Sequence, residues 1–193
     1  MLNVSCFLFH SRLDLNRPVV FWALRGGGAG SWGVLLSTTF RTFPTFDAVL
    51  QATSIVVNNT EQVSQLAMLH AKHIFDWDSL YAGQYFFWAA MPPTFTWNIA
   101  TIFPNTSLPA ATAAFAPFLD DIWSLGITPV TSVTFPANIN ELVGALTTDS
   151  GGTEVILGSR LWPEETYKTK ITAIGEAYKE LFDTGIIGYA QDL

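Results

Sequence analysis

Residues 21–37 read FWALRGGGAGSWGVLLS and hold the densest cluster of glycines in the chain. Glycine tolerates positive φ angles and leaves backbone N–H groups uncovered, so this loop can approach a flat or anionic ligand, or serve as a packing turn. Residues 28–33 also satisfy G-x-G-x-x-G, but the dinucleotide-binding motif needs a helix after its glycines. Residues 34–43 are β-branched and aromatic and predict a strand. We therefore exclude a Rossmann loop, and without Gly-Lys-Ser/Thr also a Walker loop.

The composition is poor in charge. The 193 residues carry a net charge of −7, 49% apolar and 13% charged residues, and a mean hydropathy of +0.30. The charged share is about half of what soluble domains carry. Intrinsic disorder and a basic nucleic-acid binder are excluded, and the single Cys6 excludes a disulfide scaffold. We expect an apolar face that another domain covers or that drives self-association.

No membrane span is predicted, although residues 79–119 contain no Asp, Glu, Lys or Arg. Prolines and asparagines interrupt this stretch before any run reaches the roughly 20 apolar residues of a spanning helix. The interrupting residues are Pro92, Pro93, Asn98, Pro104, Asn105 and Pro109. The apolar residues 6–9 are too few for a secretory signal.

The order of expected elements indicates an α+β fold. Strands are expected at 34–43, 48–57, 84–90, 95–103, 127–135, 155–161 and 186–190. Helices are expected at 60–75, with Thr60 as N-cap, and at 110–125, 138–146 and 163–182. Short turns between strands favour an antiparallel sheet with helices on one face.

The glycine stretch closely resembles the F-W-A-x-R-G-G-G-G-G-x-F-G-V-V-T-S motif of FAD-linked oxidases with a PCMH-type flavin domain. These are the berberine-bridge-enzyme-like group, especially its secreted fungal members of the isoamyl-alcohol-oxidase type. Weaker likenesses follow in the same order at 116–119, 125–127 and 157–161. The resemblance thus covers about residues 21–193.

The resemblance implies FAD as cofactor and backbone contacts to the flavin. The positions that match the family's motif are Gly26, Gly27, Gly28, Gly30, Gly33 and Val34. Ala29 replaces a glycine of the motif, and Trp32 stands where the family usually has Phe. No catalytic residue and no metal ligand are assigned.

The resemblance also implies a domain organisation. Residues 1–20 match nothing, 21–43 correspond to the C-terminal end of the FAD-binding domain, and 44–193 correspond to part of the substrate-binding domain. The family's R-G-G-H-type and W-R-x-x-Y-like segments have no counterpart, so we expect the chain to be a fragment that binds FAD poorly and is inactive alone. Its parent would oxidise a small organic substrate with FAD and dioxygen, and the family implies a secreted parent. The alternative is a non-enzymatic α+β binding or assembly module derived from such an oxidase.

Other candidate residues have ordinary explanations. His70 and His73 share a helical face, as a metal site requires, but lack a third ligand, so solvated positions are favoured. Two acidic pairs, Asp76 with Asp78 and Asp120 with Asp121, lie at a helix end or on a helix surface. Their carboxylates are therefore also expected to be solvated. Seven aromatic residues could line a pocket over a flavin, although core packing is favoured for each. They are Tyr81, Tyr85, Phe86, Phe87, Trp88, Phe95 and Trp97.

Overall fold

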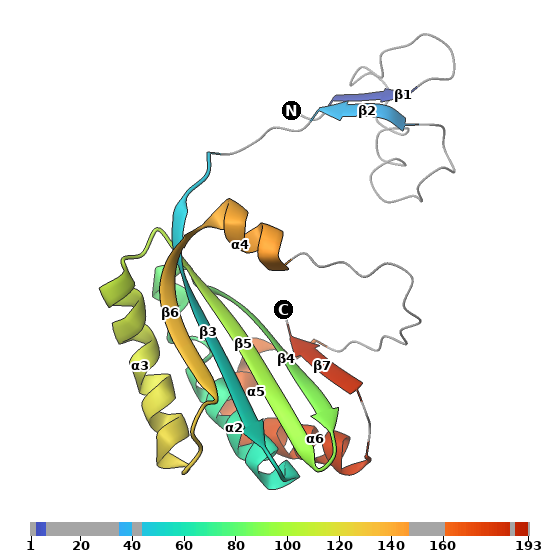
Figure 1. Ribbon diagram of the computed structural model, residues 1–193. Helices are drawn as coiled ribbons and strands as arrows, with labels where there is room; N and C mark the ends of the chain where they lie inside the picture. The colour runs from blue at the N-terminus through green and yellow to red at the C-terminus, as the bar shows by residue number, and fades with distance from the viewer. Residues whose placement is uncertain (1–2, 7–34, 40–43, 147–160, 186–187, 193) are drawn as a thin grey trace. The chain divides into compact units, whose positions relative to one another are not determined.

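The computed structural model describes residues 3–6, 35–39, 44–146, 161–185 and 188–192 (Figure 1). The chain divides into two compact units, Met1–Pro44 and Thr45–Leu193. In the first unit β1 (Asn3–Cys6) pairs antiparallel with β2 (Leu35–Thr39), with Asn3 opposite Thr39. The sequence predicted β2 within a longer strand but gave no sign of β1.

The second unit contains a five-stranded antiparallel sheet of order β6-β3-β5-β4-β7, which confirms the expected antiparallel arrangement. Its strands are β3 (Asp47–Val57), β4 (Gly83–Met91), β5 (Thr94–Pro104), β6 (Thr131–Asn138) and β7 (Gly188–Asp192). The middle strand is β5, which pairs with β3 through Ile55 opposite Trp97 and with β4 through Trp88 opposite Trp97.

Of the five α-helices in the described part of the chain, four lie on one face of this sheet and the fifth lies at the other (Figure 1). The covering helices are α2 (Thr60–His73), α3 (Leu108–Ser124), α5 (Glu164–Thr169) and α6 (Ile171–Asp183). The fifth is α4 (Ile139–Leu146), and a 3₁₀ turn, η1 (Asp78–Leu80), precedes β4. Among the described residues, no helix has both the length and the apolar character needed to cross a bilayer.

Strict alternation in β4 and β5 builds the core between sheet and helices. Phe86 and Trp88 of β4 and Trp97 and Phe103 of β5 are buried in one core cluster with Phe118 of α3. Residues two apart in a strand point to the same face, so each strand sends one set of side chains to the helices and the other set away from them. This alternation explains why the β4–β5 hairpin was predicted to within a residue or two.

Some boundaries differ from the prediction. The N-cap of α2 is Asn59, whose Oδ1 accepts a hydrogen bond of 2.8 Å from the Gln62 backbone N–H, and not Thr60. The expected helix 163–182 is two helices that meet at Lys170, with φ −130° and ψ 36°. Strand β6 begins at Thr131, later than expected, and Ile127, which was expected to begin it, is buried in the core outside the strand. The expected strand 155–161 falls almost wholly outside the described residues, and Leu161 is not in a strand.

Candidate functional site

The flavin contacts expected from the sequence lie outside the residues that the structure describes. They are Gly26, Gly27, Gly28, Gly30, Gly33 and Val34. Their role stays a prediction, and the candidate site among the described residues lies on the sheet of the second unit.

The sheet face turned away from α2, α3, α5 and α6 carries no charged side chain on β3, β4, β5 or β6. By strand pairing, this open face comprises every second residue within 48–56, 83–91, 94–104 and 131–137. An antiparallel sheet that faces water normally carries polar and charged residues on that side. The open face is therefore suited to contact with an apolar partner or ligand rather than with water.

One end of the open face is covered by α4. Leu142 of α4 is buried against Ala48 and Leu50 of β3, and Ala100 and Ile102 of β5 pack beside this small cluster. Helix α4 follows β6 directly along the chain. It turns back and packs on the sheet of which β6 is the edge strand. The rest of the open face stays uncovered by the described residues.

A hollow of about 220 Å³ lies on the uncovered part of the open face. The residues that line it are Ala52, Thr53, Ser54, Tyr85, Phe87, Asn98, Ile99, Ala100 and Thr131. Two rows of paired residues cross the strands here: Thr131, Ser54, Asn98 and Phe87 form one, and Val133, Ala52, Ala100 and Tyr85 form the next. Ala52 and Ala100 have small side chains, so the floor of the hollow lies lower than Val133 and Tyr85, the larger residues at the two ends of the same row.

The chemistry of the hollow is aromatic on one side and polar but uncharged along one row. The rings of Tyr85 and Phe87 lie 6.4 Å apart at 61°. Asn98 is half-buried, and its side chain has no hydrogen-bond partner among the described residues, although an amide can donate and accept. Sequence reasoning treated Asn98 only as a break in an apolar stretch. Its position opposite Ser54 and Phe87 becomes visible only with the register.

A second cluster of functional groups surrounds His73 at the end of α2. The ring is buried, with Nδ1 at 2.6 Å from Asp76 Oδ2 and Nε2 at 2.9 Å from Asp121 Oδ2. Lys72 Nζ donates to the same Asp121 oxygen at 2.6 Å. The expectation of solvated acids is confirmed for Asp76, Asp78 and Asp120, which are exposed, whereas Asp121 is half-buried. The cluster ties α2 to α3.

Acid is expected to weaken this link through Asp121. Hydrogen bonds from Lys72 and then from His73 hold the pKa of the Asp121 carboxyl below its ordinary value. Because the pKa is lowered in the folded state, the stabilisation is present at neutral pH and is lost as the pH falls through the folded-state pKa. Between neutral pH and about pH 2, Tm should therefore fall less in Asp121→Asn than in the parent. Asp121 is partly exposed, so the difference should be small.

Melting curves followed by circular dichroism over this pH range provide the test. Asp120→Asn is the matched control, because Asp120 is the exposed neighbour on the same helix. It should retain the parent's pH dependence. If Asp121→Asn retains that dependence too, the α2–α3 link does not contribute to acid stability.

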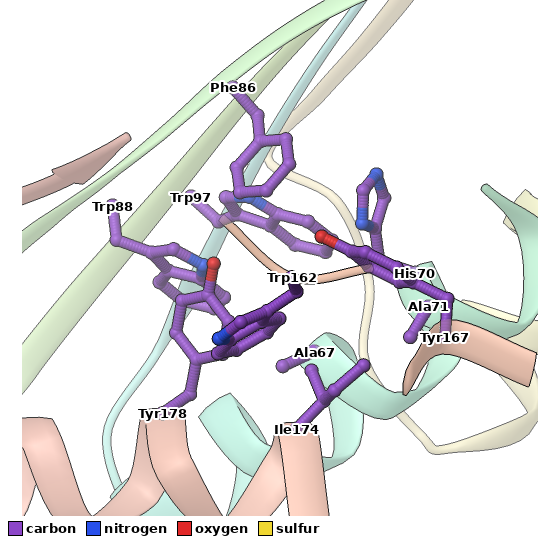
Figure 2. Close-up of a pocket in the computed structure, with 10 residues that line it drawn as sticks. All are labelled: Ala67, His70, Ala71, Phe86, Trp88, Trp97, Trp162, Tyr167, Ile174 and Tyr178. Carbon is purple, nitrogen blue, oxygen red and sulfur yellow. The ribbon is translucent and has the colours of Figure 1, made fainter. Parts of the chain in front are cut away.

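His70 lies deeper, at the edge of a small internal cavity (Figure 2). His70 is 4% exposed, and its ring meets Phe86 edge to face, with centroids 4.6 Å apart. Its Nε2–H donates to Gln84 Oε1, and Gln84 Nε2 donates to Thr101 Oγ1 at 2.7 Å. The expectation of solvated histidines is wrong for both His70 and His73, because α2 lies between the sheet and α3. Among the described residues no group of three or more His, Cys, Asp or Glu could hold a metal ion.

The internal cavity has room for about one water molecule, at about 10 Å³. Figure 2 shows side chains from α2, α6, β4 and β5 converging on it, together with Trp162 and Tyr167. The indole N–H groups of Trp88 and Trp97 are buried and have no hydrogen-bond partner among the described residues. A cavity this small cannot hold an organic substrate, so the hollow on the open face is the candidate functional site.

No protein-family model matches the chain. The FAD-linked oxidoreductase sthB of Phaeosphaeria nodorum is 32% identical over 122 residues, which cover 56% of this chain and 34% of that protein. The FAD-linked oxidoreductase patO of Penicillium expansum is 28% identical over 183 residues, which cover 89% of this chain and 30% of that protein. The chain therefore spans about a third of the length of these relatives.

Solved structures show the same fold. The VAO-type flavoprotein MtVAO713 from Myceliophthora thermophila C1 matches 93% of this chain and 34% of its own, with a TM-score of 0.64 and 18% identity. MtVAO615 from the same organism matches 86% of this chain and 30% of its own, with a TM-score of 0.60 and 22% identity. The sequence likenesses and the common fold agree with the resemblance first seen in the glycine stretch: the chain is similar to FAD-linked oxidoreductases and has the fold of part of the VAO-type flavoproteins.

Proposed function

We propose that the second unit provides the substrate-binding sheet of a flavin-dependent oxidase or dehydrogenase. When bound, FAD would accept a hydride from a small organic substrate, and dioxygen would regenerate the oxidised cofactor. The observation that carries the proposal is the uncharged open face with its hollow of about 220 Å³. Ligand sites are mostly apolar concave surfaces with a few polar groups, and this hollow has that composition.

The proposed role of the chain's own residues is to bind and orient the substrate. Tyr85 and Phe87 would pack against it and exclude water, while Asn98 would fix one polar group. The cofactor would lie against the backbone of residues 26–34, as the family motif implies. An apolar surface without charges suits a flat ring system. Binding such a ring buries no charged side chain of the sheet, so no charge is left without a partner.

The proposal extends to finer properties that the resemblance implies. They are a PCMH-type flavin domain, membership of the berberine-bridge-enzyme-like group, and secretion of the parent protein. Each is implied by the motif at residues 21–37.

The test starts from the DNA on either side of this reading frame. If translation adds an R-G-G-H-like segment upstream and a W-R-x-x-Y-like segment downstream, the extended protein should purify with stoichiometric FAD. Its visible flavin absorption should bleach when a substrate is added without oxygen and return with air. An extended protein with both segments that binds no flavin would contradict the proposal.

The alternative of a non-enzymatic binding or assembly module predicts a different result. Neither segment would then flank the chain, and the isolated 193 residues would have a partner on the open face. The uncharged face favours self-association, because Val133 and Phe135 on β6 are both more than 40% exposed. Native mass measurement of the isolated chain would show a dimer or larger species in that case, and a monomer would contradict this alternative.

A further inference from the structure

The internal cavity between the sheet and helices α2, α5 and α6 is a second site, and its chemistry differs from that of the hollow (Figure 2). We propose that it binds one water molecule, whose oxygen accepts hydrogen bonds from the indole N–H groups of Trp88 and Trp97. The site is built from described residues of the second unit alone. The inference is therefore independent of the flavin and of the proposed function.

Two buried donors on neighbouring strands need an acceptor. Trp88 on β4 is 0% exposed, and Trp97, opposite it on β5, is 1% exposed. Their indole N–H groups have no hydrogen-bond partner among the described residues. An indole N–H can only donate, and a buried donor without an acceptor destabilises the fold by the full cost of removing it from water. Because both side chains line the same cavity, a single acceptor held there would serve both.

The size and polarity of the cavity select water as this acceptor. Its volume of about 10 Å³ is close to the smallest that holds a water molecule. The residues that line it include no Lys, Arg, Asp or Glu, so an ion would be buried there without a lysine, arginine or carboxylate partner. Cavities that stay dry are lined by apolar groups, whereas two unpaired donors border this one.

Acceptors for the hydrogens of the water come from the helices. Figure 2 shows the hydroxyl ends of Tyr167, on α5, and Tyr178, on α6, turned toward the cavity. A phenol oxygen can accept a hydrogen bond from water whichever bond its own O–H makes. A buried water typically makes about three hydrogen bonds, which two indoles and two phenols can supply. The water would thus link β4 and β5 on one side to α5 and α6 on the other.

Nuclear Overhauser effects between water and indole protons test the proposal on the full 193-residue chain labelled with ¹⁵N. The indole protons of Trp88 and Trp97 should show cross-peaks to water with the NOESY and ROESY signs of a long-lived bound molecule. Trp88→Phe and Trp97→Phe assign the two indole signals by removing them. Trp77 is the matched control and should show no such cross-peak, because it is buried but its Nε1–H donates to the Ala114 carbonyl oxygen at 3.1 Å. Absence of the cross-peak from either Trp88 or Trp97 would overturn the proposal.

Tyrosine hydroxyl protons exchange with water and can produce similar cross-peaks, so a variant without them separates the two sources. In the double variant Tyr167→Phe with Tyr178→Phe, the indole cross-peaks should remain, since both indole N–H groups still hold the water. If they disappear while the circular dichroism spectrum stays that of the parent, the hydroxyl protons are their source and the proposal fails.

Filling the cavity should expel the water. Ala67 of α2 lines it, and Ala67→Val adds two carbon atoms where there is room for about one water molecule. This variant should lose the cross-peaks from both indoles. Ala113→Val, the same change at an exposed position of α3, should keep them. A folded Ala67→Val variant that keeps the cross-peaks would show that the water lies elsewhere and would reject the site, and if the variant does not fold, the measurement on the parent chain decides.

Discussion

Replacing Trp97 by alanine is expected to lower the free energy of unfolding by about 3–5 kcal/mol. The side chain is 1% exposed in the middle strand of the sheet. Its indole stacks on Trp88, with centroids 5.0 Å apart and planes within 3°, and meets Phe86 and Phe118 edge to face. Alanine would leave a large cavity where strand and helices meet. Urea unfolding followed by circular dichroism measures the loss.

Two further variants show whether packing causes this effect. Trp97→Phe keeps an aromatic ring and removes an indole N–H that has no partner among the described residues, so it should lose less than Trp97→Ala. Tyr81→Ala is the surface control, because Tyr81 is 86% exposed, and its effect should stay within about 0.5 kcal/mol. Equal losses for Trp97→Ala and Tyr81→Ala would mean that the described core does not determine stability.

The sequence predicted the strands best where alternation was strict. In β4 the aromatic cluster separates cleanly by position: Phe86 and Trp88 are in the core, whereas Tyr85 and Phe87 line the hollow. The period of two along a strand is by itself enough to divide these four residues into two pairs on opposite faces. Core packing, which was favoured for all of these residues, is confirmed for Phe86 and Trp88 and is wrong for Tyr85 and Phe87, which lie on the open face.

Tertiary contacts decided the features that the sequence did not predict. Strands β3 and β4 are consecutive along the chain, but the strand order places β5 between them. The connection from β3 to β4 through α2 crosses over the position that β5 occupies in the sheet. Helical periodicity cannot show that His70 and His73 are buried, since this depends on the packing of α3 and the sheet around α2. The break at Lys170 likewise has no proline or glycine to mark it. Asn98 became a candidate only because cross-strand pairing brings it to the hollow.

Helix α6 meets α2 closely at Gly175, and this contact should reverse a familiar substitution effect. Glycine to alanine in a helix interior normally stabilises by up to about 1 kcal/mol. A Cβ at Gly175 would lie 2.5 Å from Met68 Cγ, 2.7 Å from Ser64 Oγ and 2.9 Å from the Ser64 backbone oxygen. The Met68 side chain can move, but the Ser64 carbonyl belongs to the backbone of α2. We therefore expect Gly175→Ala to destabilise by about 1–3 kcal/mol.

Unfolding curves of single and double variants locate the cause of this loss. Gly83→Ala is the control, because a Cβ at Gly83 would meet nothing within 4 Å. Met68→Ala in the Gly175→Ala background should recover part of the stability, and coupling between the two changes would show that their side chains collide. Recovery should remain incomplete, since the Ser64 oxygen stays in place. A Gly175→Ala variant more stable than the parent would mean that α2 and α6 lie further apart than the structure has them, so that helix propensity outweighs the steric cost.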